Sequence, residues 1–151
     1  MNGQAFEWIA DADSRLGPVL EAVINGRYSW VPFSALAKIS FEEPEDLRDL
    51  VWSAAQLEFV NGGASVALIP TRYPDTAAET DGALRLARRT DWIALADPET
   101  TPHFRGLGQR VLTTSTADVD LLQVREITLQ PEPISEMHDL PEAEGTPDLA
   151  A

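Results

Sequence analysis

The fold of this chain is decided by the stretch VLEAVINGRYSWV at residues 19–31. Two runs rich in β-branched and aromatic residues flank the dipeptide Asn25-Gly26, and this arrangement is the strongest short-range sequence signature of a β-hairpin. Pro32 follows, and because proline has no amide hydrogen, it either ends the second strand or places it at a sheet edge. The stretch therefore predicts an antiparallel hairpin with a two-residue turn.

Two further hairpins are predicted along the chain. Asn61-Gly62-Gly63 separates two apolar runs in the same way, and Pro70 closes the second run. Near the end, the polar segment 115–120 separates residues 108–114 from residues 121–129, which predicts a third hairpin. Neither face of its second strand is purely apolar, so the sequence leaves the register of that strand open.

Helix is scarce in this sequence. One main helix is predicted over Ala77–Arg89, where apolar residues recur at helical spacing and arginines crowd the last turn, which suits the helix dipole. Asp75 or Thr76 can cap its start. Short helical turns are predicted at residues 34–37 and 44–50.

The predicted elements add up to one domain. We expect an α+β fold, predominantly an antiparallel, hairpin-built β sheet with barrel-like closure, about six to eight strands and one main helix. A chain of 151 residues buries enough surface for a real core, and we assign residues 1–130 to this domain. Residues 131–151 hold four prolines, six acidic residues and no cation, so we expect a disordered acidic tail there.

Charge and composition exclude several classes of function. The chain has 25 acidic and 11 basic residues, a net charge of −14; removing the six acids of the tail leaves 19 acids against 11 bases, or −8. Such a chain is a poor ligand for nucleic acid and for anionic membrane surfaces. No apolar stretch is long enough to span a membrane, and no secretory signal begins the sequence. We therefore expect a cytoplasmic protein.

Catalytic groups are few. Cysteine is absent, His138 lies in the expected tail, and His103 stands alone in a loop, so thiol chemistry, zinc sites and histidine-based triads lack their residues. Asp11 and Asp13 offer one alternative, a carboxylate-based hydrolase that uses Mg²⁺. The glycines of residues 105–110 are better explained by a bulge or tight bend than by a phosphate loop, since a strand follows them. We expect no enzyme activity, no cofactor and no resident metal.

Tryptophan and arginine suggest protein contact instead. The four tryptophans are Trp8, Trp30, Trp52 and Trp92, and we expect most of them in the core. Some nonetheless stand beside arginine or tyrosine, a composition typical of interface hot spots. The candidate partner-binding residues are Trp30, Arg48, Asp49, Trp52, Arg72 and Tyr73.

A set of phrases in one order gives a more specific indication. The phrases are FEWIADADSRLGP at 6–18, NGRYSWVPF at 25–33, DLRDLVW at 46–52, NGG at 61–63, LIPTRYP at 68–74, LRLARRT at 84–90, GLGQR at 106–110 and VREI at 124–127. Together they resemble the ImpE family, also called SciE or TagJ, accessory proteins of bacterial type VI secretion. The resemblance spans about residues 3–128.

The resemblance implies a non-enzymatic role. Members of the family generally have an N-terminal helical-repeat part and a β-rich C-terminal part, and this chain resembles only the second, so we expect the helical part to be missing here or to lie on another chain. The implied partner is the small subunit of the contractile sheath, contacted through a helix near the N-terminus of that subunit. A purely structural domain that packs against the helical part is the remaining alternative, beside the Mg²⁺-dependent hydrolase.

Overall fold

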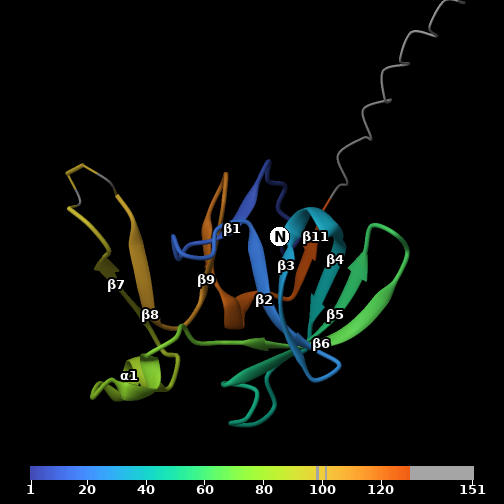
Figure 1. Cartoon of the computed structure of the whole chain (residues 1–151). Coiled ribbons are helices and arrows are strands. Elements are labelled where there is room, and N and C mark those ends of the chain that lie inside the picture. The colour runs from blue at the N-terminus through green and yellow to red at the C-terminus, as the bar shows by residue number, and fades with distance from the viewer. Residues whose placement is uncertain (98, 101, 130–151) are drawn as a thin grey trace, which may run out of the picture.

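The computed structural model describes residues 1–97, 99–100 and 102–129 (Figure 1). The expected tail and His138 lie outside the described residues. The described part contains no helix with the length and hydropathy of a membrane span.

Six strands form the main sheet, in the order β11-β4-β5-β6-β2-β3, and all neighbours in it are antiparallel. The strands are β2 (Val19–Ile24), β3 (Arg27–Pro32), β4 (Leu36–Phe41), β5 (Trp52–Phe59), β6 (Ala64–Pro70) and β11 (Glu126–Thr128). Two of the predicted hairpins are confirmed. Asn25 and Gly26 have φ of 51° and 74° and make the tight turn between β2 and β3, and the turn at Asn61-Gly62-Gly63 joins β5 to β6.

Two small sheets accompany the main sheet. The first has the order β1-β9-β10, with strands β1 (Ile9–Asp11), β9 (Val111–Thr114) and β10 (Asp118–Asp120). The second pairs β7 (Thr90–Ala94) with β8 (Phe104–Gly108). The short helical segments are η1 (Phe33–Ala35), η2 (Thr76–Ala78), α1 (Gly82–Arg85) and η3 (Leu121–Gln123).

The main sheet is strongly curled. Only the three residues of η1 join β3 to β4, although β2, β6 and β5 lie between these two strands in the sheet. Four strand spacings in a flat sheet would separate them by about 19 Å. The chain from Pro32 to Leu36 can span at most about 14 Å. The sheet must therefore bend round, as the direct turn from β3 through η1 into β4 shows (Figure 1).

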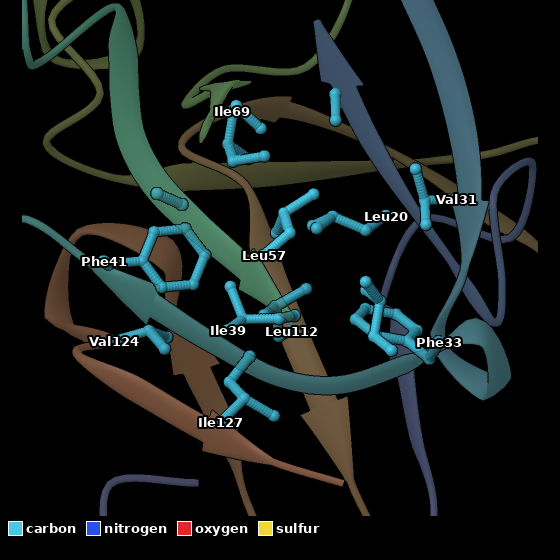
Figure 2. Packing of buried hydrophobic residues seen from close by; sticks show 14 of the residues in the cluster. Leu20, Val31, Phe33, Ile39, Phe41, Leu57, Ile69, Leu112, Val124 and Ile127 are labelled. Atoms are coloured by element: carbon cyan, nitrogen blue, oxygen red, sulfur yellow. The ribbon is translucent and has the colours of Figure 1, made fainter. Parts of the chain in front are cut away.

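The core lies inside this curl. The inner face of the main sheet contributes Leu20, Val31, Ile39, Leu57, Ile69 and Ile127, all less than one tenth exposed. Leu112 of β9 and Val124 after η3 pack among them (Figure 2). The small sheet of β1, β9 and β10 thus covers the inner face, and the core is an interface between two sheets.

The expected α+β fold is wrong, because the described chain is mostly strand. The main helix predicted over Ala77–Arg89 is reduced to α1, four residues long, after the three-residue η2. Within α1 only Leu84 is buried, and Ala87 turns the chain away with a φ of 54°. A segment with so small an apolar face gains too little from packing to extend a helix. The helical turn expected at 44–50 is a series of turns without a helix.

The barrel-like closure and the third hairpin are also wrong. Within the described residues β3 and β11 are the edges of the main sheet and do not pair with each other, so the barrel is not closed. Residues 121–129 do not pair with β9, whose hairpin partner is β10. The residues buried between 121 and 129 are Leu121, Val124 and Ile127, spaced by three, because η3 bends the chain before β11 joins β4.

Candidate functional site: an apolar outer sheet face

The outer face of the main sheet carries apolar side chains over four neighbouring strands. Side chains alternate along a strand, so the residues between the core positions point outwards. The strand registers align one row of them across the sheet, formed by Tyr28, Val23, Leu68 and Ala54. In the neighbouring row, Trp30 lies opposite Glu21 and Trp52 lies opposite Pro70. We define the outer patch as Val23, Tyr28, Trp30, Trp52, Val66 and Leu68.

Most of this outer patch is open to solvent. The exposed fractions are 61% for Tyr28, 54% for Trp30, 64% for Val66, 43% for Leu68 and 38% for Trp52. The intervening residues Ala67 and Ile69 of β6 are buried in the core, at 1% and 0%. Scattered exposed apolar residues are normal on a protein surface, but a contiguous apolar patch marks a site of interaction.

The remaining outer face is polar. On β5 the outward positions towards the hairpin end are Gln56 and Glu58, and on β4 Lys38 forms an ion pair of 2.9 Å with Glu126 of β11. These residues are those of an ordinary solvated sheet face. The apolar half therefore stands out within a single sheet.

A buried ion-pair cluster lies at one end of the outer patch. The guanidinium of Arg110, 1% exposed, donates to Asp11 Oδ2 at 2.8 Å and to Glu21 Oε2 at 2.7 Å. It also donates through Nε to the carbonyl of Pro70 at 3.0 Å. Burial lowers the pKa of Arg110, but the charges of Asp11 and Glu21 outweigh it and leave that pKa raised. The cation therefore joins β1, β2 and the end of β6 at one point.

The same cluster holds two aromatic side chains of the outer patch in place. Glu21 accepts a hydrogen bond of 2.8 Å from the hydroxyl of Tyr28 at its second oxygen. That hydroxyl in turn accepts a bond of 2.7 Å from the indole nitrogen of Trp30. A chain of hydrogen bonds, charge-assisted as far as Tyr28, thus runs from buried Arg110 to exposed Trp30 and orients both rings.

The other tyrosine of the chain, Tyr73, is buried. It is 2% exposed, its hydroxyl donates to Asp11 Oδ1 at 2.8 Å, and its ring lies 4.9 Å from the guanidinium carbon of Arg110. Burial first, and then the charge of Asp11, raise the pKa of Tyr73, so the hydroxyl stays protonated. Glycine is required at Gly106 because a side chain there would collide with the Tyr73 ring.

The two aspartates proposed for a metal are already engaged. Burial raises the pKa of Asp11, and the Arg110 ion pair offsets this only in part. Burial has the same sense for Asp13, but hydrogen bonds from Arg15 and from the amide of Gly106 outweigh it and lower the pKa of Asp13. Each carboxylate oxygen faces a donor of the chain. The described residues contain no group of three or more potential ligands that could hold a metal ion.

A cleft of about 240 Å³ opens beside this cluster. It brings together three of the predicted residues, Trp52, Arg72 and Tyr73, with Glu21 at its wall. Arg72 donates to the carbonyl of Arg85 at 2.6 Å and so ties the loop after β6 to α1. Of the three residues, only Tyr73 is buried.

The other predicted residues are more dispersed. Trp30 lies on the outer face of β3, opposite Glu21 of β2, which lines the cleft. Arg48 and Asp49 occupy the turn before β5, where the Arg48 guanidinium lies 3.6 Å from Asp46 and 3.9 Å from Asp49. The Asp49 carboxylate accepts bonds from the amides of Glu45 and Asp46, which stabilise that turn.

Sequence reasoning misplaced the tryptophans and missed the charge cluster. Most tryptophans were expected in the core, but all four are partly exposed, and Trp8 is 52% and Trp92 41% exposed. The run ASVALIP at 64–70 held a usable signal, because both of its alternating faces are apolar although only one can face the core. The cluster had no local signal, since Arg110 lies 99 residues from Asp11 along the chain.

Fold and site define a β-rich domain that holds its buried charges in internal ion pairs and leaves an apolar sheet face open. The sequence model of the family described as ImpE protein matches residues 3–128, and the chain belongs to this family. It is 47% identical over 126 residues to the type VI secretion system accessory component TagJ of Pseudomonas aeruginosa.

This similarity covers 83% of the chain but only 42% of that relative. The crystal structure of the protein VPA1032 from Vibrio parahaemolyticus has a similar fold, with a TM-score of 0.73 and 24% identity. It is matched over 83% of this chain and 45% of the solved one. The chain therefore spans less than half the length of the proteins it resembles.

Proposed function

We propose that the chain is a non-enzymatic, cytoplasmic interaction module of a type VI secretion system, and that it binds the small subunit of the contractile sheath. The observation that carries this proposal is the outer patch, which exposes tryptophan, tyrosine and aliphatic side chains on one sheet face. Tryptophan and tyrosine dominate the energetics of protein interfaces. The relative named as a type VI secretion accessory component supports the setting.

The engaged carboxylates support the non-enzymatic part of the proposal. A hydrolase that uses Mg²⁺ needs carboxylate oxygens free to reach the ion or its waters. Asp11 and Asp13 instead accept hydrogen bonds from Arg110, Tyr73 and Arg15. Their geometry is that of a structural cluster.

A second candidate role rests on the same exposed face. The relative is more than twice as long as the matched region, so the outer patch can pack against a helical part of the same assembly. In that role the chain is a structural domain, and its contact with the sheath lies elsewhere.

A pull-down with the purified small sheath subunit separates the two roles. At a chain concentration on the order of 10 µM we expect retention of the chain, and at least a tenfold loss of retention in the double variant Trp30→Ala, Trp52→Ala. Trp8→Ala is the matched control, because Trp8 is as exposed as Trp30 but lies outside the outer patch.

Two results would count against sheath binding through the outer patch. Absence of retention for the chain, both alone and with a helical-repeat part joined to it, would exclude the proposed partner. Retention that needs the helical-repeat part and is unchanged by the double variant would favour the structural role.

A further inference from the structure

We propose that β3 is a docking edge, at which an extended segment of a partner polypeptide adds antiparallel to the main sheet as a seventh strand. The segment has apolar side chains at alternate positions and lysine or arginine at its ends. This inference rests on the proposed interaction role and adds a contact at the sheet edge.

The backbone of β3 has free hydrogen-bonding groups along its outer side. In an antiparallel pair, hydrogen-bonded and non-hydrogen-bonded residue pairs alternate. The amide of Phe33 donates to the carbonyl of Pro18 at 3.1 Å, which makes 18 and 33 a hydrogen-bonded pair. Every second pair back along this register, at residues 31 and 29, is hydrogen-bonded in the same way. Tyr28 and Trp30 lie between these positions and are therefore in non-hydrogen-bonded pairs with β2. Their amide and carbonyl groups therefore point away from the sheet, at its edge.

The opposite edge of the sheet, β11, is covered at Glu126 by the chain itself. At β11 the amide of Asn2 donates to the carbonyl of Glu126 at 2.7 Å. The side-chain oxygen of Asn2 accepts bonds from the amides of Arg125 and Glu126, at 2.8 and 3.1 Å. Proteins protect sheet edges with such covers, with charges or with proline. On β3 these devices stand only at the ends, as Arg27 and Pro32, and the middle is open.

The side chains of the open edge suit an added strand. In an antiparallel addition, a residue whose amide bonds to β3 has its side chain on the same face as Tyr28 and Trp30. Apolar side chains at these alternate positions would therefore pack beside two rings that Glu21 already holds in place. Cross-strand pairs of aromatic and β-branched residues stabilise sheets.

Charge favours a basic partner over a second copy of the chain. Residues 1–130 carry a net charge of −8, from 19 acidic and 11 basic residues. A second copy would bring the same excess of negative charge to the complex, whereas lysine or arginine flanks are attracted to the net negative domain.

A model peptide tests strand addition without any secretion component. The probe is a peptide of alternating valine and threonine with two lysines at each end, and the protein is the full chain. We expect binding, together with slower hydrogen exchange of the Tyr28 and Trp30 amides when the peptide is bound. Glutamate in place of the lysines should weaken binding at low salt at least fivefold.

N-methylated peptides identify the bonds directly. Methylation of the valine amides should weaken binding at least tenfold, because these amides face β3 when valine packs on the outer patch. Methylation of the threonine amides is the matched control and should leave affinity within about threefold. Equal effects of the two methylations, or no binding of the unmodified peptide, would overturn strand addition.

The protein side provides a second comparison. Trp30→Ala and Trp30→Pro both remove the ring, but only the proline variant lacks the outward amide, so Trp30→Pro should bind the peptide at least tenfold more weakly than Trp30→Ala. Equal affinities of two folded variants would contradict the inference.

A dimer of the free chain with protected Tyr28 and Trp30 amides would assign the edge to a second copy and overturn the basic partner. If the peptide does not bind but the sheath subunit still retains the chain, strand addition is rejected and the interaction role is kept.

Discussion

The two faces of the main sheet carry similar side chains but differ in what covers them. On β6, Ile69 is buried in the core while its neighbour Leu68 is 43% exposed, and both are large aliphatic residues. The inner face meets β9 and the segment around η3, whereas nothing in the described chain covers the outer patch. The comparison teaches that hydrophobicity locates apolar faces, and that only the packing partner decides which one is core.

The largest effect is expected where the two faces meet, at Arg110. Arg110→Met leaves the carboxylates of Asp11 and Glu21 without their buried cation, and we expect a loss of about 3–5 kcal/mol in the free energy of unfolding. Urea denaturation followed by circular dichroism measures it. The control Arg48→Met removes an exposed pair and should change stability by about 0.5 kcal/mol or less. A loss below 1 kcal/mol for Arg110→Met would show that the ion-pair cluster contributes little to the free energy of unfolding.

The two neighbours on β6 compare the faces directly. Ile69→Ala should cost about 2–5 kcal/mol, because it opens a cavity in the core. Leu68→Ala should cost less than about 1 kcal/mol, since its side chain is half in solvent already. Similar losses for the two variants, measured by the same denaturation, would mean that the outer patch is covered in solution.

The two tyrosines make a similar pair. Tyr73→Phe removes the buried hydroxyl that donates to Asp11 Oδ1 and accepts from the amide of Val111, and should cost about 1–3 kcal/mol of stability. Tyr28→Phe breaks an exposed chain of bonds and should change stability by about 0.5 kcal/mol or less, while it weakens retention by the sheath subunit. Thermal unfolding and the pull-down measure the two effects. An equal loss of stability in both variants would contradict this assignment.

Acid dependence gives the smallest and most specific effect. The pKa of Asp13 is lower in the folded chain than in the unfolded chain, where it is about 3.9. The ionised carboxylate therefore stabilises the fold at pH values above the unfolded pKa. This contribution is lost as the pH falls through the folded pKa. Asp13→Asn should therefore cost about 1–2 kcal/mol at pH 7, and the difference from the parent chain should shrink as the pH falls below about 4. A difference that does not change with pH would assign the effect to packing.

Local signals in the sequence predicted two of the three hairpins correctly, and long-range contacts were out of reach. The turn at Asn25-Gly26 needs left-handed backbone at both residues, which these residue types tolerate, so the prediction depended on the turn alone. The segment 77–89 has helical spacing, but only Leu84 and Ala87 of its apolar residues are buried, and the sequence does not show which neighbours cover a face. For the same reason the sequence could suggest Trp30 and Trp52 as contact residues from their composition, but it could not show that most tryptophans lie outside the core.

The cover that Asn2 provides at Glu126 also sets a limit on assembly. A sheet with two bare edges can accept one molecule after another and grow into a fibre, as in cross-β stacking. Here Asn2 bonds to both backbone groups of Glu126 in β11, so that residue cannot pair with a strand of another molecule. Stacking of successive copies needs an open edge on both sides of the sheet, and the bonds of Asn2 oppose it on the β11 side.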